Sequence, residues 1–100
     1  MFERRHTKTV EITVFPDGGA NSIVWTPHGI ENFGEMVSVS GRLKAASGTW
    51  YPIPTPHGTS QNQLQIFVND TNIGLRSSFD WAGTDGGPQY ADVTIVYTVT

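Results

Sequence analysis

The chain has 100 residues, of which 37% are apolar and 15% are charged, and its net charge at pH 7 is −3. This length is that of a single domain with a thin core, since folding at this size buries about two-thirds of the surface of the unfolded chain. The absence of cysteine excludes a disulfide scaffold, a thiolate-ligated metal and thiol chemistry. The only basic cluster is Arg4-Arg5, so we expect no nucleic-acid partner, which would need a basic stripe.

No apolar run reaches the ~18–20 residues of a membrane-spanning helix. No signal-peptide core follows Met1. We therefore expect a protein that is made in a cytoplasm and does not insert into a membrane.

The first part of the chain predicts two strands joined by a turn. Residues 1–6 are polar and are expected to be a flexible segment or a junction to a stalk, followed by one domain over residues 7–100. Apolar and polar side chains alternate over 7–15, as in a strand with one buried face. A Pro-Asp-Gly-Gly turn at 16–19 then leads to a second strand over 21–26.

The middle of the chain predicts a long strand and a short one. The long strand covers Glu35 to Ala45, with Val37, Val39 and Leu43 on its apolar face. Gly41 within it suggests a bulge or a close backbone approach. The strand over 49–53 contains proline and is followed by proline, so it should lie at a sheet edge.

The second half of the chain predicts a loop over 55–62, strands over 63–69 and 72–78, and a long loop over 79–89. It ends at 91–100 in a run rich in β-branched residues without glycine or proline. We expect this last strand in the middle of a sheet, paired on both edges. Its core face should consist of Val93, Ile95, Tyr97 and Val99.

About eight short strands, spaced about 8–12 residues apart with turns between them, are typical of a sandwich or a barrel. No window shows a helical period of apolar residues over three turns. The sequence therefore predicts an all-β fold, an antiparallel and jelly-roll-like β-sandwich.

The polar motifs do not indicate a catalytic or metal site. Thr-Pro-His-Gly occurs at 26–29 and at 55–58, and two loop histidines could bind a metal, but proline and glycine in these places favour two turns of one chemistry. The nine carboxylates show neither a calcium-loop spacing nor a paired motif for glycoside hydrolysis. We therefore expect no metal, no cofactor and no enzymatic activity.

The aromatic residues are more informative, because several are expected in or beside loops and edges, where the core cannot accommodate all of them. An exposed ring can pack on the C–H face of a sugar while polar neighbours bind its hydroxyls. It can equally occupy a subunit interface or the core. The residues concerned are Trp25, Trp50, Tyr51, Phe67, Trp81 and Tyr90.

Several motifs of the region 33–100 follow one another in a recognisable order. They are the stretch Gly34–Gly41, the passage Ser47–Pro54 with its Tyr-Pro-Ile-Pro, the strand Gln65–Val68, the pair Asp80-Trp81 and the closing run Val93–Thr98. In this order they resemble the small C-terminal β-sandwich modules of bacteriophage tail fibres, tail spikes and baseplate receptor-binding proteins. The resemblance implies a homotrimer of jelly-roll-like heads that bind host saccharide or protein and have no fixed catalytic residue.

We accordingly expect a non-enzymatic tail-fibre head that binds host cell-surface glycan, on the virion tail, in contact with other tail proteins. Such heads usually follow a stalk, whereas this chain starts nearly at its first expected strand. The chain is therefore expected to be an excised head or a free-standing virion protein. Two alternatives stay open: a structural protein that decorates capsid or tail, and, less favoured, a glycan hydrolase. The candidate ligand-binding residues are Trp50, Tyr51, His57, Arg76, Asp80, Trp81 and Asp85.

Overall fold

The computed structural model describes residues 4–16, 22–53, 55–57, 59–77 and 86–100, with the backbone alone for 55–57 and 59–63. All regular elements in these residues are strands, so the described part of the chain is all-β. The described residues contain no helix that is long and apolar enough to cross a membrane. The strands are β1 (His6–Ile12), β2 (Ser22–Pro27), β3 (Phe33–Ala45), β4 (Trp50–Ile53), β5 (Thr55–His57), β6 (Thr59–Val68), β7 (Asn72–Ser77) and β8 (Pro88–Val99).

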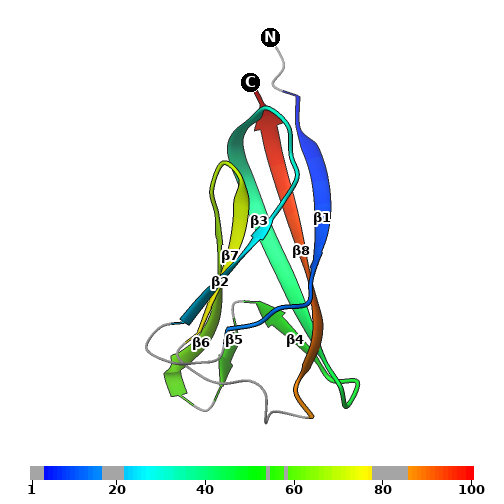
Figure 1. Cartoon of the computed structure of the whole chain (residues 1–100), viewed down its shortest axis with the longest axis vertical. Helices are drawn as coiled ribbons and strands as arrows, with labels where there is room; N and C mark the ends of the chain where they lie inside the picture. Colours follow the sequence, from blue (N-terminus) through cyan, green and yellow to red (C-terminus); the bar gives the residue numbers. More distant parts are fainter. Residues whose placement is uncertain (1–3, 17–21, 54, 58, 78–85) are drawn as a thin grey trace.

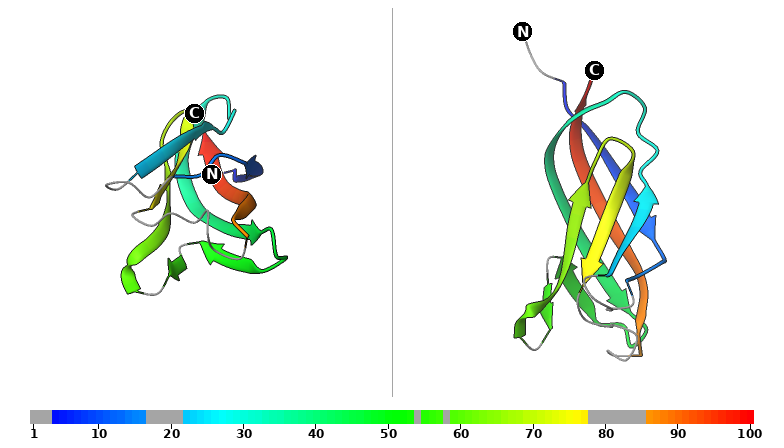
Figure 2. Two further views of the ribbon diagram at one scale, coloured as in Figure 1. Left: turned by 60° about the horizontal axis from the view of Figure 1, so that its bottom comes forward. Right: turned by 60° about the vertical axis from the view of Figure 1, so that its left-hand side comes forward.

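The strands form two antiparallel sheets, with the order β1-β8-β3-β4 in the first sheet and β2-β7-β6-β5 in the second. The two sheets lie over one another (Figures 1 and 2) and share one core. We call the core-facing side of each sheet its inner face and the other side its outer face. The buried residues of the core come from both sheets and are Ile12, Leu43, Ile53, Leu64, Ile73, Leu75, Ala91, Val93 and Ile95.

The last strand is central, as its β-branched sequence predicted. β8 pairs with β1 on one side and with β3 on the other, and the side chains of Val93 and Ile95 are fully buried. Val99 departs from the prediction, because 45% of it is exposed. It pairs with Phe33, beyond the register shifts at the start of β3, where the alternation of the two strands no longer stays in step.

Gly41 allows the two sheets to approach each other. A Cβ at this position would lie 2.7 Å from Cδ1 of Ile66 in the second sheet. The close approach at Gly41 is thus made by a side chain of the second sheet, whereas the sequence suggested a bulge or a close backbone approach. The register of β3 shifts elsewhere, near Met36 and after Lys44. The shifts near Met36 also explain why Val37, which was expected in the core, is 39% exposed.

The expected loop over 55–62 is wrong, because β5 and the first part of β6 occupy it. β5 pairs with β6 through Thr55 opposite Leu64 and Pro56 opposite Gln63. Proline is tolerated in an edge strand such as β5, and sheet pairing overrides the weak β-propensity of the polar residues. The second Thr-Pro-His-Gly motif therefore begins in a strand. The prediction that β4 lies at an edge is confirmed.

The first Thr-Pro-His-Gly motif holds the connection between β2 and β3 in place through His28. The imidazole is 2% exposed, and its Nε2 lies 2.9 Å from the carbonyl oxygen of Asn69. The backbone N–H of Ile30 donates to Nδ1 at 3.1 Å, so Nε2 carries the proton and donates to Asn69. The ring also lies 5.2 Å from that of Phe33. Both nitrogens of His28 are thus used by the backbone.

Candidate functional site

The three described side chains among the candidate ligand residues do not come together. Trp50 lies on the outer face of the first sheet and is 42% exposed. Tyr51 follows it in β4 and packs against the core, because successive strand residues point to opposite faces. Arg76 lies on the outer face of the second sheet.

The other four candidates cannot be placed at a site. His57 ends β5, and only its backbone is described. Asp80, Trp81 and Asp85 lie outside the described residues.

A small depression on the outer face of the first sheet gathers polar groups from three strands. Its volume is about 250 Å³, and we call it the outer hollow. Pairing aligns Thr9, Thr94 and Ser40 in one row and brings Asp92 beside Arg42 in the next. The outer hollow is lined by Thr9, Ser40, Gly41, Arg42, Asp92 and Thr94.

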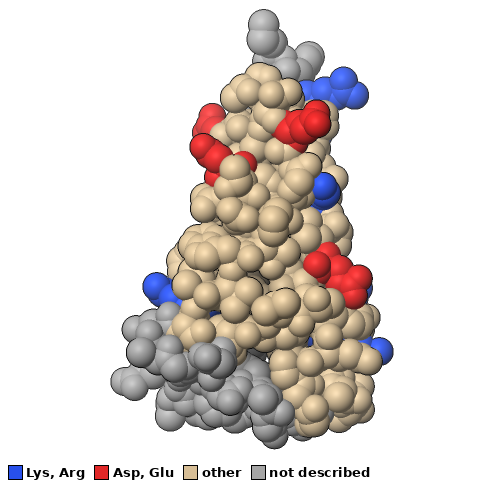
Figure 3. All heavy atoms as spheres, viewed as in Figure 1, with Lys and Arg blue, Asp and Glu red and all other residues tan. Residues whose placement is uncertain are grey.

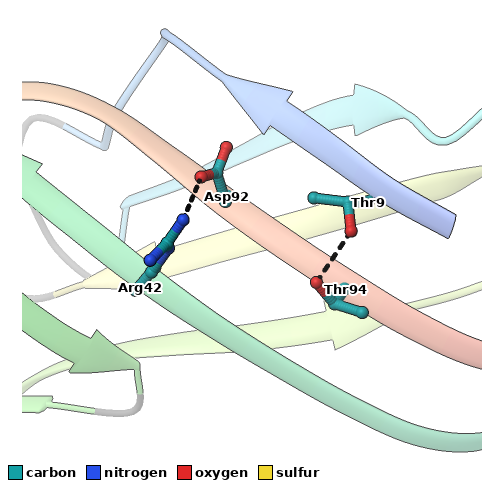
Figure 4. A network of polar contacts seen from close by, with 4 residues as sticks. All are labelled: Thr9, Arg42, Asp92 and Thr94. Carbon is teal, nitrogen blue, oxygen red and sulfur yellow. Dashed lines mark hydrogen bonds and ion pairs between the residues drawn. The ribbon is translucent and has the colours of Figure 1, made fainter.

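Two polar contacts organise the outer hollow (Figure 4). The hydroxyls of Thr9 and Thr94 lie 2.9 Å apart and share a hydrogen bond between β1 and β8. Nη2 of Arg42 donates to Oδ2 of Asp92 across 3.3 Å, with 63% of the Arg42 side chain and 22% of the Asp92 side chain exposed. The guanidinium therefore keeps free donors toward solvent while its position is fixed by the carboxylate.

Arg42 connects the outer hollow to an exposed aromatic cluster. Its guanidinium carbon lies 4.6 Å from the centroid of the Trp50 ring, and Nζ of Lys44 lies 5.6 Å from the same centroid. The ring of Tyr90 meets Trp50 edge-on, with centroids 5.8 Å apart and an interplanar angle of 85°. Packing against two cations and a second ring holds the indole in one orientation while it stays accessible.

The chemistry of the outer hollow is that of hydrogen bonding. Three hydroxyls can donate and accept, the Asp92 carboxylate accepts, and the Arg42 guanidinium donates. Glu11 lies opposite Asp92 on β1, but it does not line the hollow. In the described part of the chain, His, Asp and Glu nowhere gather in a group of three that could hold a metal ion. The hollow is therefore suited to bind a small polar group.

The short list of candidates missed the residues of the outer hollow. The sequence did contain a signal for them. Ser40 and Arg42 lie on the polar face of one expected strand, and Asp92 and Thr94 lie on the polar face of the last strand; the two faces meet when these strands pair. The list also missed Trp25 and Phe67, two exposed aromatic residues of the second sheet.

Charged side chains are scattered rather than gathered on the face that Figure 3 shows, and Lys and Arg form no stripe there. No family model matches the chain, and no curated protein and no solved structure matches it either. The function is therefore inferred from the site and from the sequence motifs.

Proposed function

We propose that the chain is a non-catalytic receptor-binding module of a phage tail fibre that recognises host cell-surface glycan, and that a sugar binds in the outer hollow beside Trp50. The supporting observation is that a guanidinium, a carboxylate and three hydroxyls line one hollow next to an exposed indole. Sugar hydroxyls both donate and accept, and the C–H face of a sugar packs on an aromatic ring.

The size of the outer hollow limits what it can hold. Its volume of about 250 Å³ is below the ~300–1,000 Å³ of pockets that enclose drug-sized ligands. We therefore propose that it binds one sugar unit of a longer glycan, which continues along the outer face toward Trp50.

The finer fold in this proposal is a jelly-roll-like sandwich. It is supported by the nested pairing of the first strand with the last and of the second with the seventh, β1 with β8 and β2 with β7. It is also supported by the core, to which both sheets contribute. β3 pairs with β4 and β8, so the nested order does not continue to a pairing between β3 and β6.

The proposed module is a homotrimer, as the resemblance implies. Three exposed apolar side chains near the end of β8 support association, because closed symmetry hides such side chains. Light scattering should give a mass near three times 10.9 kDa, and Val99→Asp should lower it. A monomeric wild type would contradict the trimer. The exposed fractions are 46% for Met36, 39% for Val37 and 45% for Val99.

Glycan arrays followed by calorimetry test the ligand site with a matched pair of variants. Asp92→Asn removes the acceptor charge of the outer hollow, and Glu11→Gln removes the charge directly opposite on the same face. A hydrogen bond to a charged group is worth about 1.5–3 kcal/mol, so affinity should fall about tenfold or more for Asp92→Asn. Glu11→Gln should change it less than about threefold. Equal affinities of Asp92→Asn and wild type would overturn the proposed site.

Two outcomes would favour the alternatives. Binding to phage particles that lack the protein, together with no binding to host cells, would indicate a decorating protein of the capsid or tail. Release of reducing sugar from host envelope would indicate a hydrolase.

A further inference from the structure

Trp25 lies face-on over Gly74 on the outer face of the second sheet. A Cβ on Gly74 would lie 2.8 Å from Cζ3 of the indole and 3.1 Å from both of its bonded neighbours, Cε3 and Cη2. An edge-on ring would hold these two neighbours farther away than Cζ3 by well over half a bond length, so the ring presents its face to the glycine. The opposite face of the indole points to solvent, and the residue is 48% exposed.

A second exposed aromatic residue lies in the same row of the sheet. Gly74 pairs with Trp25 on β2 and with Phe67 on β6, so the three residues form one row across the sheet. Phe67 is 38% exposed. Neighbouring strands lie about 4.8 Å apart, so the Cα atoms of Trp25 and Phe67 are about 10 Å apart across the glycine. Ile23, 39% exposed, lies two residues before Trp25 on the same face.

Arg76 is fixed beside these rings. Its guanidinium carbon lies 4.8 Å from the centroid of Phe67, and its Nη2 donates to Oε1 of Gln65 at 2.9 Å. Arg76 pairs with Ile23 and Gln65 in the row next to Gly74. We call this surface the aromatic face; it consists of Ile23, Trp25, Gln65, Phe67, Gly74 and Arg76.

The aromatic face carries a single charge, which is positive. Its described strand residues include no Asp or Glu, whereas Arg42 on the other sheet is paired with Asp92. A planar guanidinium binds a carboxylate through two parallel hydrogen bonds. A second copy of the aromatic face would offer Arg76 no carboxylate, so a symmetric dimer through this face would leave both guanidinium groups without a charged partner.

We propose that the aromatic face binds a carboxylate-bearing polysaccharide, with sugar rings stacked on Trp25 and Phe67 and a uronate group on Arg76. This inference goes beyond the proposed function, because it concerns a second site, and it rests on that function only in the choice of a saccharide as ligand. The aromatic face and the outer hollow are on outer faces of different sheets, so variants of one leave the other intact.

The test is calorimetric titration with oligogalacturonate, beside the same oligomer after methyl esterification. Wild type should bind the acid form, and sodium chloride should weaken binding. Trp25→Ala should lower affinity about tenfold or more, as stacking on one ring typically contributes. Arg76→Gln should lower affinity for the acid form about tenfold and leave the ester unchanged. Lys8→Gln removes a positive charge from β1 of the first sheet, outside both surfaces; it is the charge-matched control for Arg76→Gln and should change neither affinity by more than about twofold.

Gly74→Ala is a second variant, which keeps the indole but displaces it, because the new methyl group would occupy the space against which the ring packs. It should therefore also weaken binding while circular dichroism shows an intact fold. Equal binding of acid and ester, or unchanged affinity in Trp25→Ala, would overturn the proposal. So would a loss of oligomer mass in Trp25→Ala by light scattering, because the face would then be a contact between copies. If the aromatic-face variants bind normally while Asp92→Asn does not, this inference fails and the outer hollow stands.

Discussion

A methyl group at Gly41 should destabilise the fold by an amount that depends on one neighbour. The added Cβ would meet Cδ1 of Ile66 at 2.7 Å and the carbonyl oxygen of Asp92 at 3.3 Å. Overpacking costs about 1–3 kcal/mol, and replacing a strand glycine by alanine recovers about 0.5–1 kcal/mol. We therefore expect Gly41→Ala to lower the free energy of unfolding by about 1 kcal/mol.

Removing the opposing methyl group should reverse this loss. Ile66→Val deletes Cδ1 and should by itself cost about 0.5–1.5 kcal/mol. In the double variant the new methyl at Gly41 fills the space left by Cδ1. The double variant should therefore be as stable as Ile66→Val alone, with a coupling of about 1 kcal/mol relative to additive losses.

Urea unfolding followed by tryptophan fluorescence measures the coupling, provided that the denaturant slope m stays constant among the variants. The control pair is Gly41→Ala with Ile73→Val. Ile73 is fully buried, but none of its atoms is among the three nearest to the new Cβ. This pair should be additive within about 0.5 kcal/mol. If the pair of Gly41 with Ile66 is equally additive, the close approach of the sheets is not the cause of the destabilisation.

Three further predictions concern single side chains. His28→Ala loses two hydrogen bonds and a ring contact, so it should lower the free energy of unfolding in urea by about 2–3 kcal/mol. His6→Ala, which loses only a stacked ring, should lower it by about 1 kcal/mol, and equal losses in the two variants would contradict the prediction. Thr98→Val removes the acceptor of the Glu35 N–H and should cost about 1 kcal/mol by the same measurement; an unchanged stability would show that water replaces the bond. Asp92→Asn should change stability by less than about 1 kcal/mol, since its ion pair is largely exposed on the arginine side, and a larger loss would make it unsuitable as a binding variant.

The strand pattern could be predicted well where alternation and β-branching agree. The last strand is the strongest case, since Val93 and Ile95 are fully buried between two partner strands. Prediction failed over 55–62, where polar residues with low β-propensity pair with a neighbouring strand. It failed again at Val37, because two register shifts near Met36 are set by the pairing of β3 with β8 and leave no mark in the local sequence.

The prediction of the candidate residues failed for the same reason, because it too depended on which strands pair. Local context could show that Trp50 and Arg76 lie near turns or edges, but it could not show that they belong to different sheets. The residues of the outer hollow come from three strands that are adjacent only after β8 has inserted between β1 and β3. Such a site depends on long-range pairing, so no spacing in the sequence identifies it.

Gly74 illustrates how a residue acquires meaning from its partners. In the sequence it is a glycine inside a strand, which by itself suggests only a bulge or a close approach. In the fold it lies opposite Trp25 and Phe67 at once, and its missing side chain is the space in which the indole lies. A glycine that weakens the central strand β7 is explained if the ring above it must lie flat. A surface on which sugar rings stack would require a flat ring at this place. The variant Gly74→Ala therefore separates the role of Trp25 and Gly74 in binding from the role of Gly74 in the sheet.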